Sequence, residues 1–475
     1  MSKERTFPID KIRKDSNVIL YGAGKNGKEL LRLNEKIKWC NIFLTVDIDY
    51  KIKSDFPIPV VSPQILSERK DYDFILVSVV EISVRNKIRQ YLMNMGIEQD
   101  KIIDDIDVFI WREERTVIIE NKDNGMEDDH PLLIGFLPGG VMGDNVISLR
   151  LYQEFVKLAP YSMIDVFTSF QGFPEHVFYN QKNLRQIIHR LPVDEDKKKY
   201  DIIIQSHFEP SLIYCNLSRV RKLYRELEER LRILFRYQMT DFFTCAPAQY
   251  MNRLQWDRAK FRGYNCYTIL GISGAFDIKD YKVDFPLNPD YAEKFCQLGL
   301  GNQYITFNYG ASDPLKNGKQ QTKVWPLEYH AVLNDMIKKT FPDIKVVQLG
   351  AGDMMPVPGA DKYVLGENLE VIKYVLKNAM CHIDCEGGLV HIASQLGTKC
   401  FVVFGPTPVD FFGYESNENI VSKECKECCG LVQDWYTRCY KYERPRCMKS
   451  IKPEAVFEKL GKWLYTKDKC DENNR

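Results

Sequence analysis

The sequence predicts an α/β protein made of three consecutive blocks, in each of which short apolar strands alternate with helices. Two observations predict this class. The chain has 475 residues, too many for a single hydrophobic core, so two or three domains are expected. In addition, apolar runs repeatedly end in glycine-rich turns and are followed by segments in which apolar residues recur at helical spacing. That alternation is typical of parallel, doubly wound sheets.

The first block, residues 1–111, starts with the apolar run NVILY and continues directly into the glycine turn GAGKNG. The turn matches the pattern G-x-G-x-x-G, and an acidic residue ends the next predicted strand. These are features of a dinucleotide-binding fingerprint, and the block resembles the small Rossmann-like domains that precede various sugar-modifying enzymes. A nucleotide or nucleotide-sugar site is one interpretation, and a scaffold or docking module is the other. The candidate site residues are Gly22, Gly24, Gly27 and Asp47.

The other two blocks follow a polar, charged stretch at residues 112–130 that predicts a linker. The second block covers residues 131–290 and the third residues 291–475, which imply a cleft between two doubly wound sheets. The glycine loops PGGVMGD and CEGGLVH both follow predicted strands, at the edge where such sheets bind ligands. Residues 218–238 predict one charged amphipathic helix. Its charges indicate a solvated face, and contact with an acceptor or with another subunit of a homo-oligomer is the alternative.

Composition excludes several classes of partner. The formal net charge of +1 gives no reason to expect nucleic acid or an anionic membrane as a partner. The first residues, MSKERTFPIDKIRKD, lack the apolar core of a signal peptide, and no apolar run is long enough to span a bilayer. The sequence therefore predicts a cytoplasmic protein, in which the 14 cysteines stay reduced or bind metal.

The stretch CEGGLVHIASQL predicts an anion site at a helix start. Two glycines precede a segment with helical spacing, so a ligand can approach the free backbone N–H groups, and the helix dipole favours negative charge there. His391 falls about one turn into this helix. An ordinary connection, with glycines chosen for tight packing, is the alternative.

Three motifs together resemble a known family. VMGDNVIS, TKVWPLEYH and CEGGLVHIASQLGTKCFVVFGPTP are similar to the signature segments of glycosyltransferase family 9, the heptosyltransferases, and occur in the same order. The resemblance implies a GT-B fold, in which two Rossmann-like domains face a cleft. It also implies inverting transfer of a sugar, heptose from ADP-heptose, with no catalytic divalent metal. The acceptor would be a bacterial surface glycan, as in lipopolysaccharide, or a protein such as an autotransporter.

The resemblance assigns roles to individual residues. Asp144 matches the aspartate of the family's Met-Gly-Asp loop, the general base for the acceptor hydroxyl; helix capping is the alternative. Lys323 matches the lysine that contacts the donor phosphate, and a solvated surface lysine is the alternative. The remaining residues matched to donor binding are Gly143, Glu386, Gly387, Gly388, Leu389 and His391.

One position departs from the family pattern. Where the family has Asp-Thr-Gly or Asp-Ser-Gly, this chain has Glu386, Gly387 and Gly388. A longer acid and the missing hydroxyl change the expected donor contacts. Asp384, two residues earlier, is either the functional acid or the end of a strand.

Residues 423–449 predict a metal-binding finger. The segment contains five of the cysteines, two of them in a C-x-x-C motif, a spacing that lets two thiolates reach one Zn or Fe ion. It resembles the iron-binding finger of the autotransporter heptosyltransferases. Four thiolates leave no open position, so the ion is expected to be structural; reduced, buried cysteines are the alternative. The best-spaced ligands are Cys425, Cys428, Cys439 and Cys447, with Cys429 left over.

Two other classes of function compete with the glycosyltransferase. An NAD-dependent oxidoreductase would use the first glycine turn, but it leaves residues 131–475 without a role. A non-catalytic nucleotide-binding protein would keep the fold without turnover, and Glu386 is the main observation in its favour.

Overall fold

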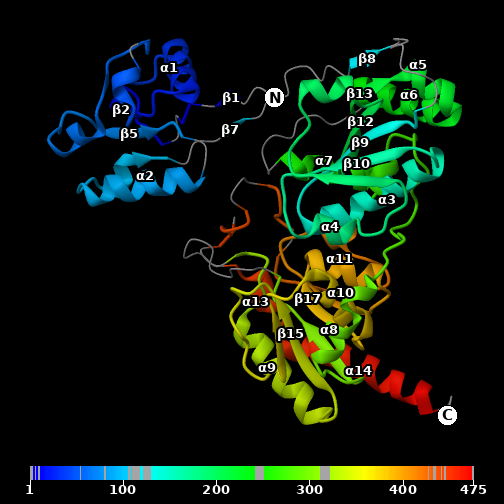
Figure 1. The fold of residues 1–475 in the computed structure, drawn as a ribbon. Helices are drawn as coiled ribbons and strands as arrows, with labels where there is room; N and C mark the ends of the chain where they lie inside the picture. Colours follow the sequence, from blue (N-terminus) through cyan, green and yellow to red (C-terminus); the bar gives the residue numbers. More distant parts are fainter. Residues whose placement is uncertain are drawn as a thin grey trace. The chain divides into compact units, whose positions relative to one another are not determined.

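The structure is a computed structural model and confirms the predicted α/β class. The chain divides into two compact units, the first ending at Glu114 and the second beginning at Arg115 (Figure 1). The structure describes residues 4–5, 7–8, 11–53, 55–79, 82–104, 108–109, 118–120, 130–240, 251–310, 321–425, 427–431, 435–439, 441–442 and 445–472.

The first unit is a small Rossmann-like sheet. Its five parallel strands have the order β4-β3-β2-β5-β6. The strands are nearly continuous apolar runs, as expected when helices cover both faces. Its elements are β1 (Glu4–Arg5), β2 (Asn17–Tyr21), α1 (Lys25–Ile37), β3 (Asn41–Val46), β4 (Val60–Val61), β5 (Phe74–Val77), α2 (Ile82–Asn94), β6 (Ile102–Ile103) and β7 (Val108–Phe109).

The second unit begins with a six-stranded sheet of order β11-β10-β9-β12-β13-β8. All neighbours in it are parallel except β12 and β13, which form an antiparallel hairpin. Its elements are β8 (Ile118–Glu120), β9 (Leu133–Pro138), α3 (Met142–Leu158), β10 (Met163–Phe167), α4 (Pro174–Val177), β11 (Leu184–Ile188), β12 (Ile202–His207), β13 (Glu209–Asn216), α5 (Leu217–Leu223), α6 (Arg225–Thr240) and α7 (Met251–Phe261).

A second six-stranded sheet, of order β16-β15-β14-β17-β18-β19, completes this unit and is wholly parallel. Two Rossmann-like halves within one unit give the GT-B arrangement (Figure 1). The elements of this half are α8 (Ala292–Gln297), β14 (Tyr304–Phe307), α9 (Leu327–Thr340), β15 (Lys345–Gly350), β16 (Lys362–Leu365), α10 (Leu369–Asn378), β17 (His382–Cys385), α11 (Gly388–Gln395), β18 (Cys400–Phe404), α12 (Val409–Phe412), β19 (Glu418–Val421), α13 (Cys447–Ser450) and α14 (Pro453–Glu472).

Each of the three sheets reverses its direction of winding at one point, and a candidate site follows it in every case. The reversals lie between β2 and β5, between β9 and β12, and between β14 and β17. At such points two loops diverge and leave a crevice at the carboxyl ends of the strands. The turns after β2, β9 and β17 are the glycine-rich segments identified in the sequence.

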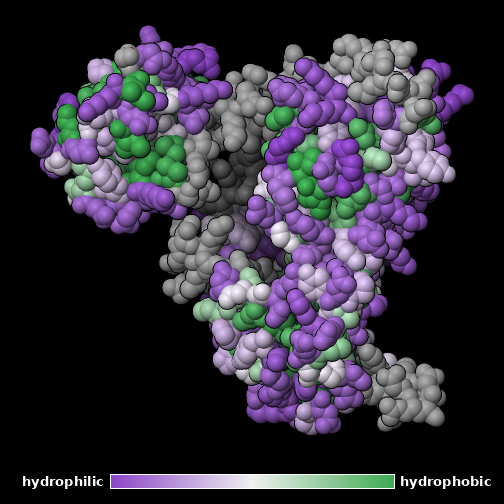
Figure 2. Space-filling model, in the orientation of Figure 1, coloured by the Kyte–Doolittle hydropathy of each residue, from purple (hydrophilic) through white to green (hydrophobic). Residues whose placement is uncertain are grey.

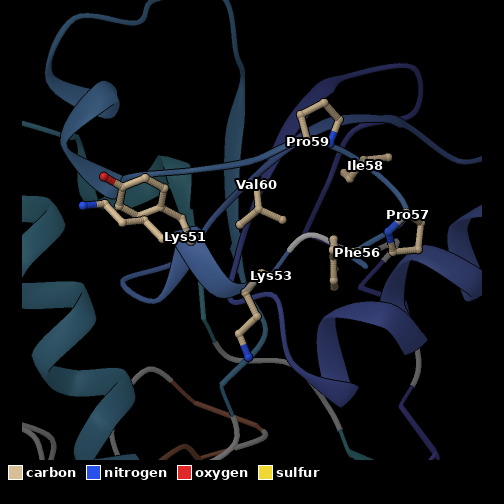
Figure 3. Close-up of a pocket in the computed structure, with 8 residues that line it drawn as sticks. Lys51, Lys53, Phe56, Pro57, Ile58, Pro59 and Val60 are labelled. Carbon is tan, nitrogen blue, oxygen red and sulfur yellow. The ribbon is translucent and has the colours of Figure 1, made fainter.

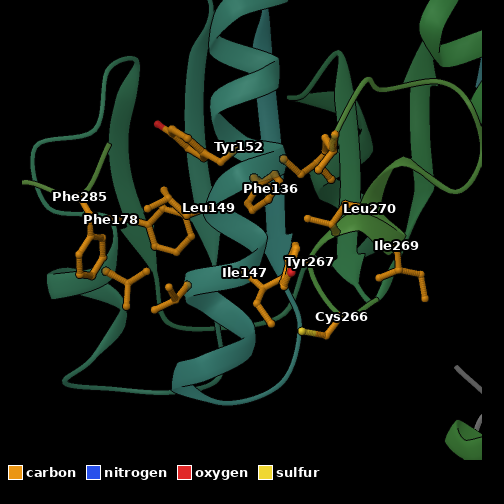
Figure 4. Packing of buried hydrophobic residues seen from close by; sticks show 14 of the residues in the cluster. Phe136, Ile147, Leu149, Tyr152, Phe178, Cys266, Tyr267, Ile269, Leu270 and Phe285 are labelled. Atoms are coloured by element: carbon orange, nitrogen blue, oxygen red, sulfur yellow. The ribbon is translucent and has the colours of Figure 1, made fainter. Parts of the chain in front are cut away.

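The core of the second unit is continuous across its two halves. One cluster of buried apolar side chains includes Phe136 on β9 and Tyr152 on α3, and extends to Val390 on α11 and Val402 on β18. Figure 4 shows Phe136, Leu149, Tyr152 and Phe178 packed around α3. Because this helix is covered on most sides, ten of its residues are buried.

The observed elements differ from the sequence prediction in two places. Residues 118–120, predicted as linker, form β8 and pair with β13, because a short apolar run there completes the edge of the sheet. The predicted single helix at 218–238 is two helices, α5 and α6, which break at Tyr224 with φ −144° and ψ 86°. The hydroxyl of Tyr224 accepts a hydrogen bond from the backbone N–H of Tyr161.

A membrane-spanning helix must be long and apolar. No helix in the part of the chain that the structure describes is long and apolar enough to cross a bilayer. The face drawn in Figure 2 is mostly hydrophilic, with small apolar patches.

His330 on α9 is a buried titratable group with an unusual environment. The side chain is 1% exposed, stacks on Phe307 at 5.4 Å between ring centroids and meets the edge of Trp325 at 4.7 Å. Neither ring nitrogen has a hydrogen-bond partner among the described residues. Burial lowers the pKa of His330 from 6.5 to about 3, so the folded protein keeps the ring neutral.

Replacing this histidine, as in His330→Leu, should make the protein less sensitive to acid. The unfolded chain takes up a proton below its ordinary pKa of 6.5 whereas the folded chain does so only near 3, so stability is lost as the pH falls between these values. From pH 7.5 to pH 5 the wild type should lose about 2 kcal/mol more unfolding free energy than the variant. Urea unfolding at both pH values measures this. The exposed His130 provides the control, His130→Leu, which should leave the pH dependence unchanged; identical curves for His330→Leu and wild type would contradict the prediction.

Candidate active site

The loop after β9 holds the predicted general base at the start of α3. The N–H of Gly139 donates to the carbonyl of Ser206 at 2.6 Å, which fixes the loop against β12. Asp144 is the third residue of α3, and its Oδ2 accepts the N–H of Val141 at 2.9 Å. Gly140 has φ +65°, and a Cβ there would collide with the Asp144 carboxylate. The capping role considered for Asp144 is therefore present, and one carboxylate oxygen is engaged by it.

The turn after β17 leads into α11 as the sequence predicts. Gly387 is the N-cap in extended conformation, and no side chain caps the helix. Gly388 is the first residue of α11. The N–H of Val390 donates to the carbonyl of Gly387 at 3.2 Å. The N–H groups of Gly388 and Leu389 come before any intrahelical acceptor, which leaves them for an anion.

These two helix starts meet at a closely packed seam with a glycine on each side. A Cβ on Gly143 would lie 2.6 Å from Cδ2 of His391, and one on Gly388 would lie 2.5 Å from Cε of Met142. The helices α3 and α11 pack against each other. The seam therefore brings the Met-Gly-Asp loop of one half directly against the Gly-Gly turn of the other.

His391 at this seam is a buried side chain whose surroundings favour the neutral ring. It is 5% exposed, and its Nδ1 lies 2.7 Å from the hydroxyl of Tyr414. Burial raises the pKa of Tyr414 well above its usual value, so the phenol keeps its proton. Burial also lowers the pKa of His391, which favours the neutral ring. Nε2 is the ring nitrogen nearer Gly143. No motif in the sequence points to Tyr414, which is 23 residues from His391.

Lys323 is buried in an ion pair rather than solvated. Its Nζ lies 2.5 Å from Oε2 of Glu386, and the two side chains are 17% and 9% exposed. Burial alone would lower the pKa of Lys323, but the Glu386 carboxylate more than offsets this and raises it. Glu386, the acid that departs from the family pattern, therefore holds Lys323, the predicted phosphate-binding residue, in place.

A cavity of about 310 Å³ opens beside the seam. Met142 lines it from the first half of the unit, and Gly387, Gly388, Leu389 and Asp384 line it from the second. The predicted residues thus fall into two sets: the residues of the glycine turn line this cavity, whereas the others lie outside its lining. The residues outside the lining are Gly143, Asp144, Lys323, Glu386 and His391.

Asp384 is the end of a buried polar chain. Its Oδ2 lies 3.2 Å from Nε2 of His382, whose Nδ1 lies 2.9 Å from the hydroxyl of Thr306. The N–H of Cys385 donates to Oδ1 of Asp384 at 2.7 Å. Burial raises the pKa of Asp384 despite these partners. Asp384 lies within β17, which ends at Cys385, and it also lines the cavity. A role for Asp384 as the functional acid stays a prediction.

The finger brings its four best-spaced cysteines to one place. Cys425, Cys428, Cys439 and Cys447 line a single cavity of about 520 Å³. Four soft sulfur donors are a set that Zn or Fe binds. No three or more His, Cys, Asp or Glu side chains among the described residues are close enough to hold an ion, so the thiols would have to converge on binding it. Cys429 is 2% exposed and does not line this cavity.

In the first unit, Gly22 and Gly27 are closely packed, whereas a Cβ on Gly24 would meet nothing within 4 Å. Gly22 has φ +109°, and a Cβ on Gly27 would collide with the carbonyl of Gly22. The two oxygens of Asp47 accept the N–H groups of Ala23 at 2.6 Å and Asp49 at 2.9 Å. Asp47 thus closes the glycine turn, and a nucleotide there remains a prediction.

A third cavity, of about 300 Å³, lies in the loop after β3. Figure 3 shows Lys51, Lys53 and Phe56 among the residues that line it. A Cβ on Gly27 would lie 3.3 Å from Cζ of Phe56, so this cavity adjoins the glycine turn.

The comparison with known proteins agrees with the motifs. No protein-family model and no curated protein matches this sequence. A glycosyltransferase family 9 structure from Veillonella parvula shares 14% identity over 71% of this chain and 97% of its own, with a TM-score of 0.45. The ADP-heptose lipopolysaccharide heptosyltransferase II of Escherichia coli shares 15% identity over 71% of this chain and 100% of its own, with a TM-score of 0.44. The iron-containing dodecameric glycosyltransferase TibC of enterotoxigenic E. coli shares 13% identity over 71% of this chain and 77% of its own, with a TM-score of 0.46. These structures include members of the family that the motifs resemble.

Adding a methyl group at the seam, as in Gly143→Ala, should destabilise the second unit. The new Cβ would meet His391, which Tyr414 and its buried surroundings hold in place, and overpacking of this kind costs about 1–3 kcal/mol. Thermal and urea unfolding measure the change. Gly461→Ala is the matched control, because a Cβ there meets nothing within 4 Å and a helical Gly→Ala change should raise stability by about 0.5–1 kcal/mol. Equal stability of Gly143→Ala and wild type would show that the seam tolerates a side chain.

Proposed function

We propose that this protein is an inverting glycosyltransferase that uses a nucleoside-diphosphate sugar, with ADP-heptose as the donor. The observation that carries the proposal is the seam, where the Asp144 loop contacts the uncapped start of α11. The seam brings a carboxylate from one domain close to an anion-binding turn from the other. This arrangement suits transfer of a sugar from a diphosphate leaving group to an acceptor hydroxyl.

Each group has a defined task in this reaction. Asp144 uses Oδ2 to accept the Val141 N–H, and among the described residues this is its one hydrogen bond, so Oδ1 can take the acceptor proton. The first N–H groups of α11 bind the diphosphate, and Nε2–H of His391 adds a neutral donor. As the acceptor oxygen attacks the anomeric carbon, the bond to the diphosphate breaks on the opposite face. The negative charge then grows beside the helix start, where fixed dipoles stabilise it.

Lys323 supplies the cation for the leaving group. In the free protein its charge is neutralised by Glu386, which keeps the ammonium ordered in a buried position. Such a preorganised charge needs little rearrangement when the diphosphate arrives. No divalent ion is required in this scheme. The acceptor is proposed to be a bacterial surface glycan or a protein, and the chain is proposed to act as a homo-oligomer.

We further propose that Cys425, Cys428, Cys439 and Cys447 bind one structural iron or zinc ion. What supports this is that all four line one cavity and that a closed set of thiolates would fold a loop that has little apolar core of its own. The ion would hold the finger together and take no part in group transfer.

Changing the base, as in Asp144→Asn, should abolish most turnover while preserving the fold. Asparagine keeps an oxygen that can cap Val141 but cannot take a proton, so kcat should fall at least about 100-fold. The dissociation constant for ADP should change little. Product formation from ADP-heptose and calorimetry with ADP measure the two quantities. The exposed Asp194, paired with Lys197, offers the control Asp194→Asn, which should keep full turnover. Near-normal turnover of Asp144→Asn would end the general-base assignment.

Elemental analysis of the purified protein should find about one iron or zinc per chain. Cys439→Ser should lose the metal and lower the melting temperature, because one ligand is removed from a closed site. Cys296→Ser is the matched control, since Cys296 is an exposed free cysteine outside the finger. Metal-free wild-type protein with all finger thiols open to titration would refute the metal assignment.

A further inference from the structure

A first attachment of the finger to the donor site is made by the buried residue Thr322. This side chain is 1% exposed, and its hydroxyl donates to the carbonyl of Trp435 at 2.9 Å. Its backbone N–H donates to the carbonyl of Tyr436 at 2.9 Å. Trp435 and Tyr436 belong to the finger, between Cys428 and Cys439. Two carbonyls of the finger therefore fix the residue that directly precedes Lys323.

Two side chains of the finger also face the ion pair. Cys429 and Tyr436 both lie close enough to Lys323 and Glu386 to interact with them electrostatically. Cys428, one residue before Cys429, instead lines the finger cavity. The two adjacent cysteines thus divide the finger into a face toward its own thiols and a face toward the donor site.

A second attachment holds the finger against the strand beside the phosphate turn. The N–H groups of Cys428 and Cys429 donate to the carbonyl of Pro406 at 3.0 and 2.9 Å. Pro406 follows β18, which pairs with β17. A Cβ on Gly405 would lie 3.2 Å from Sγ of Cys447, so the end of the finger also packs closely here. The finger is therefore in contact both with Thr322, next to Lys323, and with the segment that follows β18.

We propose that the finger positions Lys323 for the donor, and that the hydrogen bonds of Thr322 to Trp435 and Tyr436 transmit this effect. The proposal rests on the proposed function for its link to a donor, but not for the link between finger and lysine. A finger with a purely structural role would stabilise the fold without affecting one particular ammonium group.

The physical basis is the cost of ordering a lysine. A lysine side chain loses up to about 2 kcal/mol of conformational freedom when fixed, and a buried ion pair is favourable only in good geometry. Thr322 fixes the backbone from which Lys323 extends, so its loss should let the ammonium group leave Glu386 part of the time. Thr322 is thus a positioning residue rather than a catalytic one.

Chemical labelling of Lys323 tests the link without any nucleotide. Full-length protein is treated with an N-hydroxysuccinimide acetylating ester, and acetylation of Lys323 is followed by peptide mass spectrometry. Thr322→Val keeps the shape and the backbone N–H but removes the hydroxyl, and Lys323 should then react about three to ten times faster than in wild type. Thr322→Ser restores the hydroxyl and should react like wild type. Thr322→Ala provides a second truncation in case the valine variant does not fold.

Thr398→Val is the matched control, since the buried Thr398 hydroxyl also donates to a backbone carbonyl, that of Leu376 at 2.8 Å, but on the side of α11 away from the phosphate turn. In Thr398→Val, Lys323 should react at the wild-type rate even if the melting temperature of this variant falls. Equal labelling in Thr322→Val or Thr322→Ala and in Thr398→Val would overturn the proposal.

Calorimetry with ADP separates this proposal from the proposed function. If wild type binds ADP, Thr322→Val should bind it about three to ten times more weakly, and unchanged affinity would refute a role in donor binding. If wild type does not bind ADP, the proposed donor is wrong, and the labelling comparison alone still decides whether the finger positions Lys323.

Discussion

The absence of two side chains at the seam between α3 and α11 is the constraint on which the site depends. Gly143 leaves room for the ring of His391, and Gly388 leaves room for Met142. Because both helix starts reach the same place, the carboxylate of one half and the anion-binding turn of the other can act on one substrate pair. The apolar core that runs through both halves of the unit keeps these loops in register.

Two buried lysines extend this constraint away from the seam. Lys323 pairs with Glu386 at the donor site. Lys373, on α10, pairs with Glu370 and donates to the carbonyls of Pro286 at 2.7 Å and His176 at 3.2 Å, which joins α4 of the first half to α10 of the second. A buried ammonium without such partners would be costly. Each lysine is therefore held by a carboxylate from its own half, and the polar partners determine where its charge sits.

The candidate site could be predicted from the sequence as far as its local motifs reach. The turn CEGGLVH is an uncapped helix start, and Asp144 is the third residue of a helix. Both could be predicted because glycine and acid patterns at a helix start act over a few neighbouring residues. The partners of these residues could not be predicted. Tyr414 bonds His391 from the segment after α12, and Trp435 bonds Thr322 across 113 residues of chain. No short-range pattern encodes such pairings.

The sequence by itself determined the three βα-alternating blocks, since strand and helix periodicity and glycine turns are local properties. It also determined that five cysteines would gather in one loop. Only the tertiary structure decided that Cys429 faces the donor site while Cys428 faces the finger cavity. It likewise placed residues 118–120 in a sheet and joined Glu386 to Lys323. These outcomes depend on which surfaces meet when the blocks pack, and the free energy of that packing is distributed over the whole core rather than over any one motif.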